Sequence, residues 1–437
     1  MELLQKNNHT KAPRHKDKSN LFNLIFYLRA ANRRFDVLLC AIFLFYSTIW
    51  AQSPIAIDPA VEAPEVISRS ALVMDAATGT VIYSKNPDEK IPPASLTKLM
   101  TIHLALKAIA GNTTLLDEPI TPPRESWAIN QPPRSSLMAL AEGQRLNLKE
   151  LLLGMAVFSG NDAATAAALR FAPTVDDFVA MMNMEAAALG FPNTRFADAS
   201  GYSEANMTTA GEFAGFCRIY LEAHPESLKN YHSVREYAYP KPENYIDENM
   251  MINRSRVYRN NNSLLGKVEG VDGLKTGYIP ESGYNIALTA ERTGTRFIAV
   301  VLGAPSQWGG DRIRDADGTK LLEWAFANYK TLRPQVGALP PVRIWKGREN
   351  FVNPVPAEPL QFTALAERGE EISWHINCKE PLIAPLPRGS PVGELVLYDS
   401  SGELRRIPLV TASDSERGGF FKRLFDSIRL FFKRIKK

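Results

Sequence analysis

Ser95-Leu96-Thr97-Lys98, Ser159-Gly160-Asn161 and Lys275-Thr276-Gly277 occur in this order along a chain of 437 residues, separated by roughly 60 and 115 residues. Any one of these strings is weak evidence, because such short patterns arise by chance in a chain of this length. Their combined order, with a fitting sequence around each string, is not expected by chance. It indicates a single site assembled from three distant segments.

The first string places a serine and a lysine one helical turn apart. Pro92-Pro93-Ala94 leads into Ser95, so a helix is predicted to begin there, with Lys98 on the same face. A lysine held neutral by burial can take the proton of a serine hydroxyl and so create a nucleophile. The start of a helix also supplies free backbone N–H groups for an oxyanion. The alternative for these residues in isolation is a helix N-cap serine followed by a solvated lysine.

The second string interrupts two apolar helical stretches, Leu151–Phe158 and Ala163–Leu169. A functional interpretation gives Ser159 a place in proton transfer to a leaving amine. Asn161 would then bind the backbone of a substrate and Lys98. The alternative is a turn between helices in which Asn161 acts only as a cap. The neighbouring Asp162 is assigned no role.

The third string lies in Val271–Tyr278, which is typical of a strand at the edge of a cleft. Lys275 and Thr276 offer a cation and a hydroxyl donor, which suit the terminal carboxylate of a peptide. Gly277 allows a ligand backbone to approach closely, and the Tyr278 N–H is a candidate second oxyanion donor. An ordinary transition from strand to turn remains the alternative.

The periodicity around these strings predicts an α+β fold. Strands are expected at residues 70–75, 80–84, 270–276, 284–290 and 296–302, a mainly helical block at residues 95–228, and a helix at residues 312–329. Strands at both ends of a domain with helices between them do not form a simple series of parallel units. They fit an antiparallel sheet whose first and last strands meet, flanked by helices and carrying a helical insert.

A second domain and a terminal helix are expected after this first domain. From about residue 331, proline residues separate short apolar stretches. Strands are predicted at 361–364, 372–376, 391–397 and 406–410. Residues 331–412 are therefore expected to form a small all-β domain. Within residues 417–437, one helical face carries only apolar side chains: Phe421, Leu424, Phe425, Ile428, Phe431, Phe432 and Ile435. Basic residues flank that face: Lys422, Arg423, Arg429, Lys433, Arg434, Lys436 and Lys437. Such an amphipathic helix suits the interface of an anionic membrane, and packing on the protein itself or on a partner is the alternative.

The N-terminus predicts that the body of the chain lies outside the cytoplasm, and the charge distribution predicts membrane contact at the two ends. Residues 1–34 carry eight Lys and Arg against two acidic residues, and residues 417–437 carry eight against one. Basic ends of this kind favour membrane contact and argue against a nucleic-acid-binding body. Residues 1–53 are predicted to be a signal peptide with a basic n-region and an apolar run at 37–50, and residues 54–64 a linker. An uncleaved N-terminal anchor is the alternative.

Through the three strings and their order, the chain resembles the D-alanyl-D-alanine carboxypeptidases. These are low-molecular-mass penicillin-binding proteins of the penicillin-recognising serine peptidase family. The resemblance covers about residues 65–330 and continues more weakly to 412. Further stretches agree: Asn193-Thr-Arg-Phe-Ala-Asp-Ala-Ser-Gly201, Asn260-Asn-Asn-Ser-Leu-Leu265, Gly270-Val-Asp-Gly-Leu-Lys-Thr-Gly277, Gly283-Tyr-Asn285 and Leu302-Gly-Ala304. The implied catalytic fold is that of the β-lactamases and DD-peptidases.

The resemblance implies an enzyme at the periplasmic face of the inner membrane that removes the last D-alanine from peptidoglycan stem peptides and is acylated by β-lactam antibiotics. Ser95 would form the acyl-enzyme and Lys98 would be the acylation base. Ser159, Asn161 and Lys275 would complete the site. An arginine after the third string, placed at Arg314 with Arg312 as the alternative, would help to bind the substrate carboxylate. Neither a cofactor nor a metal is expected.

Departures from the family pattern keep other interpretations open. Many relatives have His-Thr where this chain has Tyr278-Ile279, and some have an arginine where it has Asn261. No glutamate is apparent in the place that class A β-lactamases use for deacylation, so efficient β-lactam hydrolysis is not expected. A DD-endopeptidase or transpeptidase on the same site, and a non-catalytic peptidoglycan-binding protein, are the alternatives.

Overall fold

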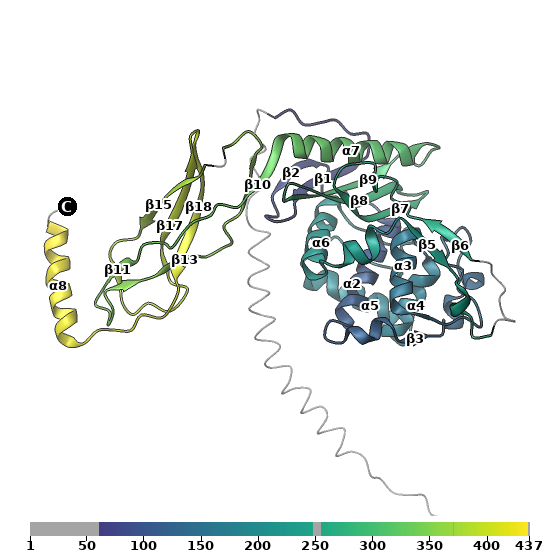
Figure 1. The fold of residues 1–437 in the computed structure, drawn as a ribbon, viewed down its shortest axis with the longest axis horizontal. Coiled ribbons are helices and arrows are strands. Elements are labelled where there is room, and N and C mark those ends of the chain that lie inside the picture. The colour runs from purple at the N-terminus through teal and green to yellow at the C-terminus, as the bar shows by residue number, and fades with distance from the viewer. Residues whose placement is uncertain (1–60, 248–254, 370, 436–437) are drawn as a thin grey trace, which may run out of the picture. The chain divides into compact units, whose positions relative to one another are not determined.

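The computed structural model describes residues 61–247, 255–369 and 371–435. The predicted signal peptide and the first part of the predicted linker lie outside the described residues. A five-stranded antiparallel sheet, in the order β2-β1-β9-β8-β7, organises the first domain (Figure 1). Its strands are β1 (Ser70–Asp75), β2 (Val81–Lys85), β7 (Val271–Ile279), β8 (Gly283–Arg292) and β9 (Thr295–Ala304). Strand β1 pairs with β9, so the prediction that the first and last strands of the sheet meet is confirmed.

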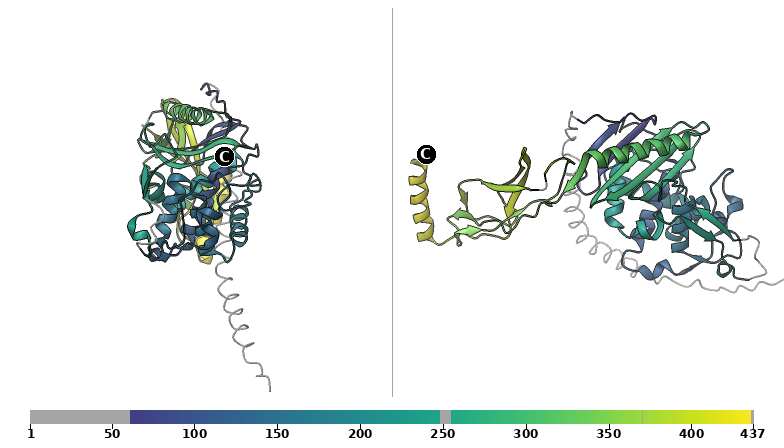
Figure 2. Two further views of the ribbon diagram at one scale, coloured as in Figure 1. Left: turned by 90° about the vertical axis from the view of Figure 1, so that its right-hand side faces the viewer. Right: turned by 45° about the horizontal axis from the view of Figure 1, so that its top comes forward.

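Helices cover both faces of this sheet, and Figure 2 shows α7 (Gly310–Asn328) lying across one of them. The opposite face carries the helical block: α2 (Lys98–Ala108), α3 (Leu148–Phe158), α4 (Asn161–Phe171), α5 (Val175–Ala188) and α6 (Ala210–Ala223). Alternate residues of β9 enter two different cores. Ile298 and Val300 pack with the helical block, whereas Phe297 and Val301 pack towards α7.

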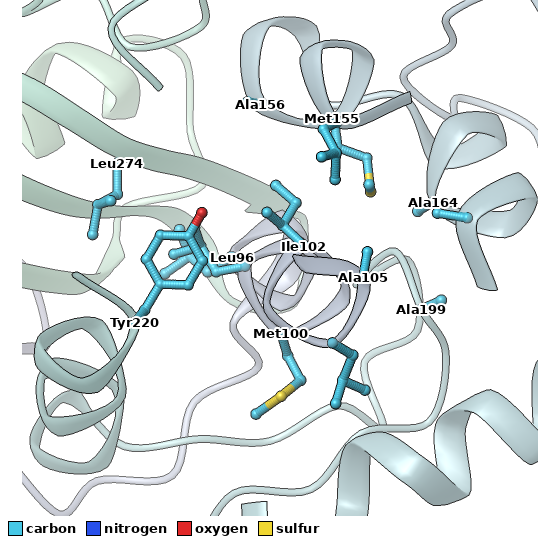
Figure 3. Packing of buried hydrophobic residues seen from close by; sticks show 14 of the residues in the cluster. Leu96, Met100, Ile102, Ala105, Met155, Ala156, Ala164, Ala199, Tyr220 and Leu274 are labelled. Atoms are coloured by element: carbon cyan, nitrogen blue, oxygen red, sulfur yellow. The ribbon is translucent and has the colours of Figure 1, made fainter. Parts of the chain in front are cut away.

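Helix α2 is the centre of the larger core. Its residues Lys98 to Ala105 are all buried, because other helices surround it. Figure 3 shows Met100, Ile102 and Ala105 of this helix among side chains from α3, α4 and α6. The start of α2 is therefore held by close packing, and a side chain there has little freedom to move.

The break between α3 and α4 is specified locally. Asn147 caps α3, since its Oδ1 accepts from Glu150 N at 3.0 Å while Glu150 Oε2 accepts from Asn147 N at 3.1 Å. The helix ends at Ser159, which has a left-handed backbone conformation with φ of 67°. Helix α4 then begins at Asn161, so the second string forms the predicted short break between two helices.

Several short elements of the first domain were not predicted. Strand β3 (Pro119–Ile120) pairs with β4 (Leu146–Asn147), and β5 (Glu236–Tyr239) pairs with β6 (Arg256–Arg259). The other short elements are η1 (Ala94–Thr97), η2 (Thr113–Leu116), η3 (Arg124–Ser126), η4 (Ala128–Asn130), η5 (Leu228–His232) and η6 (Pro242–Asn244). The β5–β6 pair lies against the end of α3, where Phe158 stacks on Tyr258 with ring centroids 4.0 Å apart. Packing on this ring stabilises strands that are too short to show a pattern of their own.

The residues after α7 form a second, β-rich part with its own core. Its elements are β10 (Tyr329–Leu332), β11 (Val342–Trp345), β12 (Phe351–Val352), β13 (Pro354–Pro356), β14 (Phe362–Leu365), β15 (Ser373–Cys378), β16 (Leu382–Ile383), β17 (Pro391–Asp399) and β18 (Gly402–Thr411). The four predicted strands correspond to β14, β15, β17 and β18. Leu395, Leu397, Ile407 and Leu409 are fully buried in this core. Cys378 of this part and Cys217 of α6 are free cysteines.

The chain ends in the predicted amphipathic helix, α8 (Phe420–Ile435). Its seven apolar residues named above are between 45% and 73% exposed. The buried Asp426, by contrast, accepts a hydrogen bond from Lys346 N at 2.7 Å and so attaches the helix to the turn after β11. Among the described residues, no helix combines the length and apolar character that crossing a bilayer requires.

Candidate active site

Ser95 and Lys98 meet where η1 passes into α2. Lys98 Nζ lies 3.0 Å from Ser95 Oγ, 2.7 Å from Asn161 Oδ1 and 2.6 Å from the Ser200 carbonyl oxygen. Ser95 is half-buried, whereas Lys98 is fully buried. The predicted helix start is thus a 3₁₀ turn followed by an α-helix, and the first two strings come together through Lys98 and Asn161.

The burial of Lys98 decides its chemistry. Removal from water lowers the pKa of its amine from 10.5 to about 7, against the opposing negative charges of Asp198 and Asp162. A large fraction of the amine is therefore neutral near neutral pH. A neutral amine beside a serine hydroxyl is a proton acceptor.

The Ser200 carbonyl was missed by the sequence analysis, and Asp198 holds it in place. Asp198 Oδ1 accepts from Ser200 N and Gly201 N, each at 2.7 Å, and Oδ2 accepts from Ser203 N at 2.8 Å. Burial alone would raise the pKa of Asp198, but hydrogen bonds from Ser203, Asn206 and Ser200 lower it below its ordinary value. The Asp-x-Ser-Gly sequence is a turn signal that could have indicated this loop.

The second string lies against the segment Ser135–Leu140. Asn161 Nδ2 donates to Ser135 Oγ at 3.1 Å, and Asn161 N donates to Ser136 O at 2.7 Å. Ser159 is buried, and its Oγ has no hydrogen-bond partner among the residues that the structure describes. A buried hydroxyl in this state is available to a ligand or a water molecule.

Asp162, to which the sequence analysis assigned no role, organises the same segment. Its carboxylate accepts from Met138 N at 2.7 Å and from Leu140 N at 3.0 Å. Burial raises the pKa of Asp162, although the hydrogen bonds from these backbone N–H groups oppose the rise. Asp162 therefore acts on the geometry of the site and does not face Ser95 in a hydrogen bond.

The third string lies on β7, the edge strand of the sheet, directly beside the start of η1. A Cβ atom on Gly277 would lie 2.7 Å from Pro93 O and 3.1 Å from Ser95 N. Only glycine allows this approach. The backbone of β7 at Gly277 and the Ser95 N–H consequently lie next to each other.

Lys275 is a second buried amine in this region. Its Nζ donates to the Thr276 carbonyl at 2.9 Å, and the side chain is 1% exposed. Burial, followed by the positive charges of Lys98 and Arg314, holds the pKa of Lys275 well below its usual range. An anion bound here would reverse that effect, because it stabilises the protonated amine.

Comparison with known proteins agrees with this geometry. Residues 58–306 match the protein family described as D-alanyl-D-alanine carboxypeptidase. The chain belongs to this carboxypeptidase family. Residues 336–417 match a second family, described as the C-terminal domain of penicillin-binding protein 5. The predicted family, α+β fold class and serine D-Ala-D-Ala carboxypeptidase activity are thereby confirmed.

Curated relatives and solved structures span most of the chain. It is 32% identical over 396 residues to D-alanyl-D-alanine carboxypeptidase DacC of Escherichia coli K12, covering 89% of this chain and 94% of that protein. It is 30% identical over 358 residues to DacF of Bacillus subtilis 168, covering 81% and 87%. Penicillin binding protein 5 from Haemophilus influenzae superposes with a TM-score of 0.71 at 26% identity, covering 82% of this chain and all of that one.

Arg314 of α7 is the arginine that the resemblance to the carboxypeptidases implies as a ligand of the substrate carboxylate. Its guanidinium binds Asp315 Oδ1 through Nε at 2.8 Å and Nη2 at 2.6 Å, and lies 5.9 Å from the ring centre of Tyr284. Tyr284 in turn lies beside the half-exposed Tyr278, with ring centroids 4.3 Å apart. Arg312, the other arginine of this turn, lies over Trp308 instead. The charge of Arg314, and not that of Arg312, is among the causes that lower the pKa of Lys275.

Proposed function

We propose that this carboxypeptidase removes the terminal D-alanine from peptidoglycan stem pentapeptides through an acyl-enzyme on Ser95. The observation that carries the proposal is the fully buried Lys98 amine, whose pKa is about 7, at 3.0 Å from Ser95 Oγ. A buried amine in this state serves as the acylation base, and the other site residues take roles around it.

The hydrogen bonds of Lys98 suit a neutral amine. Such an amine has two N–H bonds and one lone pair. Asn161 Oδ1 and the Ser200 carbonyl are both acceptors, at 2.7 Å and 2.6 Å, and they take the two N–H bonds. The lone pair then faces the Ser95 hydroxyl. Lys98 is in this way directed towards the proton that it must remove.

Acylation follows from this arrangement. Ser95 Oγ attacks the carbonyl carbon of the penultimate D-alanine while its proton passes to Lys98. The backbone N–H groups of Ser95 and Tyr278 stabilise the oxyanion. The C–N bond to the terminal D-alanine then breaks, and the amine leaves with a proton that is delivered from Lys98 through the Ser159 hydroxyl.

Deacylation uses the same groups in reverse order. A water molecule gives a proton to Lys98 and attacks the ester carbonyl, and Ser95 Oγ departs and recovers the proton. The products are D-alanine and a peptide shortened by one residue. A β-lactam acylates Ser95 by the same attack, but its amine stays tethered to the acyl group after the ring opens.

Recognition of the substrate carboxylate is assigned to Lys275, Thr276 and Arg314, with Gly277 allowing the peptide backbone to lie along β7. Two cations near one carboxylate explain why an enzyme of this kind requires a free C-terminus. The carboxylate would raise the pKa of Lys275 and so favour the charged form of this amine in the complex.

The domain boundaries and the location of the protein are assigned from the sequence patterns. Residues 1–53 are assigned to a signal peptide, 65–330 to the catalytic domain, 331–412 to the small β domain and 417–437 to a membrane-anchoring helix. Export would place the enzyme at the periplasmic face of the inner membrane. The exposed apolar face of α8, flanked by basic side chains, supports peripheral contact with an anionic membrane surface. Deletion of residues 418–437 is expected to release the protein from membranes.

Release of D-alanine from a diacyl-L-lysyl-D-alanyl-D-alanine peptide tests this function. The wild-type protein should release one D-alanine per peptide, and Ser95→Ala should release none. A protein that joins or cleaves cross-linked peptides without releasing free D-alanine would instead be a transpeptidase or an endopeptidase.

A further inference from the structure

A groove of about 420 Å³ lies between the first turns of α8 and the adjoining loops of the β-rich part. It is lined by Lys346, Ile383, Ala384, Arg417, Phe420, Arg423, Leu424 and Ser427. Its volume falls within the range of small-molecule sites. The active site uses none of these residues.

Three cations surround this groove, and none of them forms an ion pair within the described part of the chain. They are Lys346, Arg417 and Arg423. The acidic residues nearby are engaged elsewhere: Asp426 with Lys346 N and Lys422, and Glu416 with Arg348. The groove therefore has a net positive charge with no acidic side chain in its lining.

Arg423 adds a second and independent observation. Its Nε atom is buried and has no hydrogen-bond partner among the described residues. A buried guanidinium N–H without an acceptor costs free energy. A rotation of the Arg423 side chain that turns this N–H towards the groove would let an anion there provide the acceptor, and Lys346 and Arg417 line the same groove.

The groove adjoins the apolar face of α8. Residues 420, 423, 424 and 427 follow helical spacing and form one side of the groove. Leu424 belongs both to this side and to the exposed apolar face, on which Phe425 and Ile428 are 61% and 46% exposed. Ile383, on the opposite wall, is 41% exposed. A ligand that fits both surfaces carries an anionic group and, directly attached to it, hydrocarbon.

We propose that this groove binds the phosphate of an anionic phospholipid headgroup. The proposal rests on the membrane contact of α8 argued above and adds to it a binding site for one class of lipid. The phosphate contacts Lys346, Arg417 and Arg423, and the acyl chains extend along the apolar face of α8 past Leu424. The attachment of α8 through Asp426 keeps the two walls of the groove together while the lipid is bound.

The test uses the full chain and two triple variants of equal charge. The groove variant is Lys346→Gln, Arg417→Gln and Arg423→Gln. The matched control, Lys379→Gln, Arg388→Gln and Arg429→Gln, removes three exposed cations from the same two parts of the chain, none of which lines the groove. Acylation by benzylpenicillin should be the same in all three proteins.

Two measurements separate the groove from general attraction to a charged surface. The first is partition onto phosphatidylglycerol–phosphatidylcholine vesicles against vesicles of phosphatidylcholine alone. The second is titration with dihexanoyl-phosphatidylglycerol below its micelle concentration, beside a titration with inorganic phosphate. The groove variant should lose about tenfold or more in its affinity for phosphatidylglycerol vesicles and in its affinity for the soluble lipid. The control variant should lose less than about threefold in its affinity for the soluble lipid.

If the two variants lose equal affinity for the soluble lipid, the proposed lipid site in the groove is wrong, whereas the membrane contact of α8 is unaffected. Absence of soluble lipid binding by the wild-type protein would also overturn it, as would inorganic phosphate that binds as tightly as the lipid. If the soluble lipid binds but the vesicles do not, the groove is supported and the membrane contact is wrong.

Discussion

Lys98 Nζ lies 3.0 Å from Ser95 Oγ, and the two residues are only three positions apart. The atoms that orient the amine come from much farther along the chain, since Asn161 is 63 residues away and Ser200 is 102 residues away. The reactive pair is thus local, whereas its preorganisation is a product of the fold.

The rate of acylation should follow the titration of Lys98. Because burial lowers the pKa of this amine to about 7, it is protonated and unable to act as a base at lower pH. The second-order rate constant for acylation by benzylpenicillin should therefore rise with pH, about tenfold per unit below pH 7, and level off above about pH 8. A rate that stays constant between pH 5.5 and 8.5 would exclude Lys98 as the titrating base.

Asp198→Asn should change both the rate and its pH dependence. The negative charge of Asp198 raises the pKa of Lys98, so its removal should move the rising limb of the pH profile to lower pH. The amide cannot accept from Ser203 N as the second carboxylate oxygen does, so the Ser200 carbonyl should lose its fixed position. We expect a loss of about 10- to 100-fold in acylation rate.

The control for this variant is Asp176→Asn, which removes an exposed carboxylate from the first turn of α5. Its rate and pH profile should match those of the wild-type protein. An unshifted pH profile in Asp198→Asn, even with a reduced rate, would show that the loop affects only the folding of the site.

Gly277→Ala should impair the reaction by a steric effect. The new Cβ atom would lie 2.7 Å from Pro93 O and 3.1 Å from Ser95 N, so β7 must move away from the start of η1. Acylation should fall about 100-fold while the protein remains folded. Gly111→Ala is the matched control, because its Cβ atom meets nothing within 4 Å. Equal rates in the two variants would place the oxyanion site away from β7.

Binding of a peptide with a free C-terminus should be accompanied by proton uptake. The pKa of Lys275 is held well below its usual range by burial and by the neighbouring cations, and a carboxylate would raise it. Titration calorimetry of Ser95→Ala in buffers of different ionisation enthalpy, repeated across a range of pH, should reveal this uptake. The same peptide with a C-terminal amide should show none. Heats that do not depend on the buffer for the free acid would refute the role of Lys275.

The sequence predicted those parts of the site whose signal is local. The spacing of Ser95 and Lys98 places them on one helical face, and the apolar stretches on both sides of Ser159 define a break between helices. By contrast, the contact of the Ser200 carbonyl with Lys98 is made by backbone, and a backbone carbonyl has no residue-type signature. Only the turn signal at Asp198 was available.

The contacts of Asp162 could not be predicted from the sequence either. Its hydrogen bonds reach Met138 N and Leu140 N, 24 and 22 residues earlier in the chain. A carboxylate next to a motif gives no indication in the sequence of whether it is buried or which backbone groups it binds. Tertiary contacts alone decide its role.

In the fold, too, the elements with a local sequence pattern were predicted and those without one were missed. The five strands of the main sheet are long enough to show an apolar pattern, and their meeting at β1 and β9 followed from their order in the chain. The missed strands, such as β5 and β16, contain two to four residues and are stabilised by pairing and by packing on neighbours. Patterns of that length do not distinguish strand from loop.

The intact mass of the protein after exposure to benzylpenicillin, with the modified peptide located by fragmentation, tests most directly whether Ser95 is the nucleophile. We expect one covalent adduct per chain, attached to Ser95 and lost in Ser95→Ala. An adduct on another residue, or no adduct on a folded protein, would contradict the assignment of Ser95 as the nucleophile.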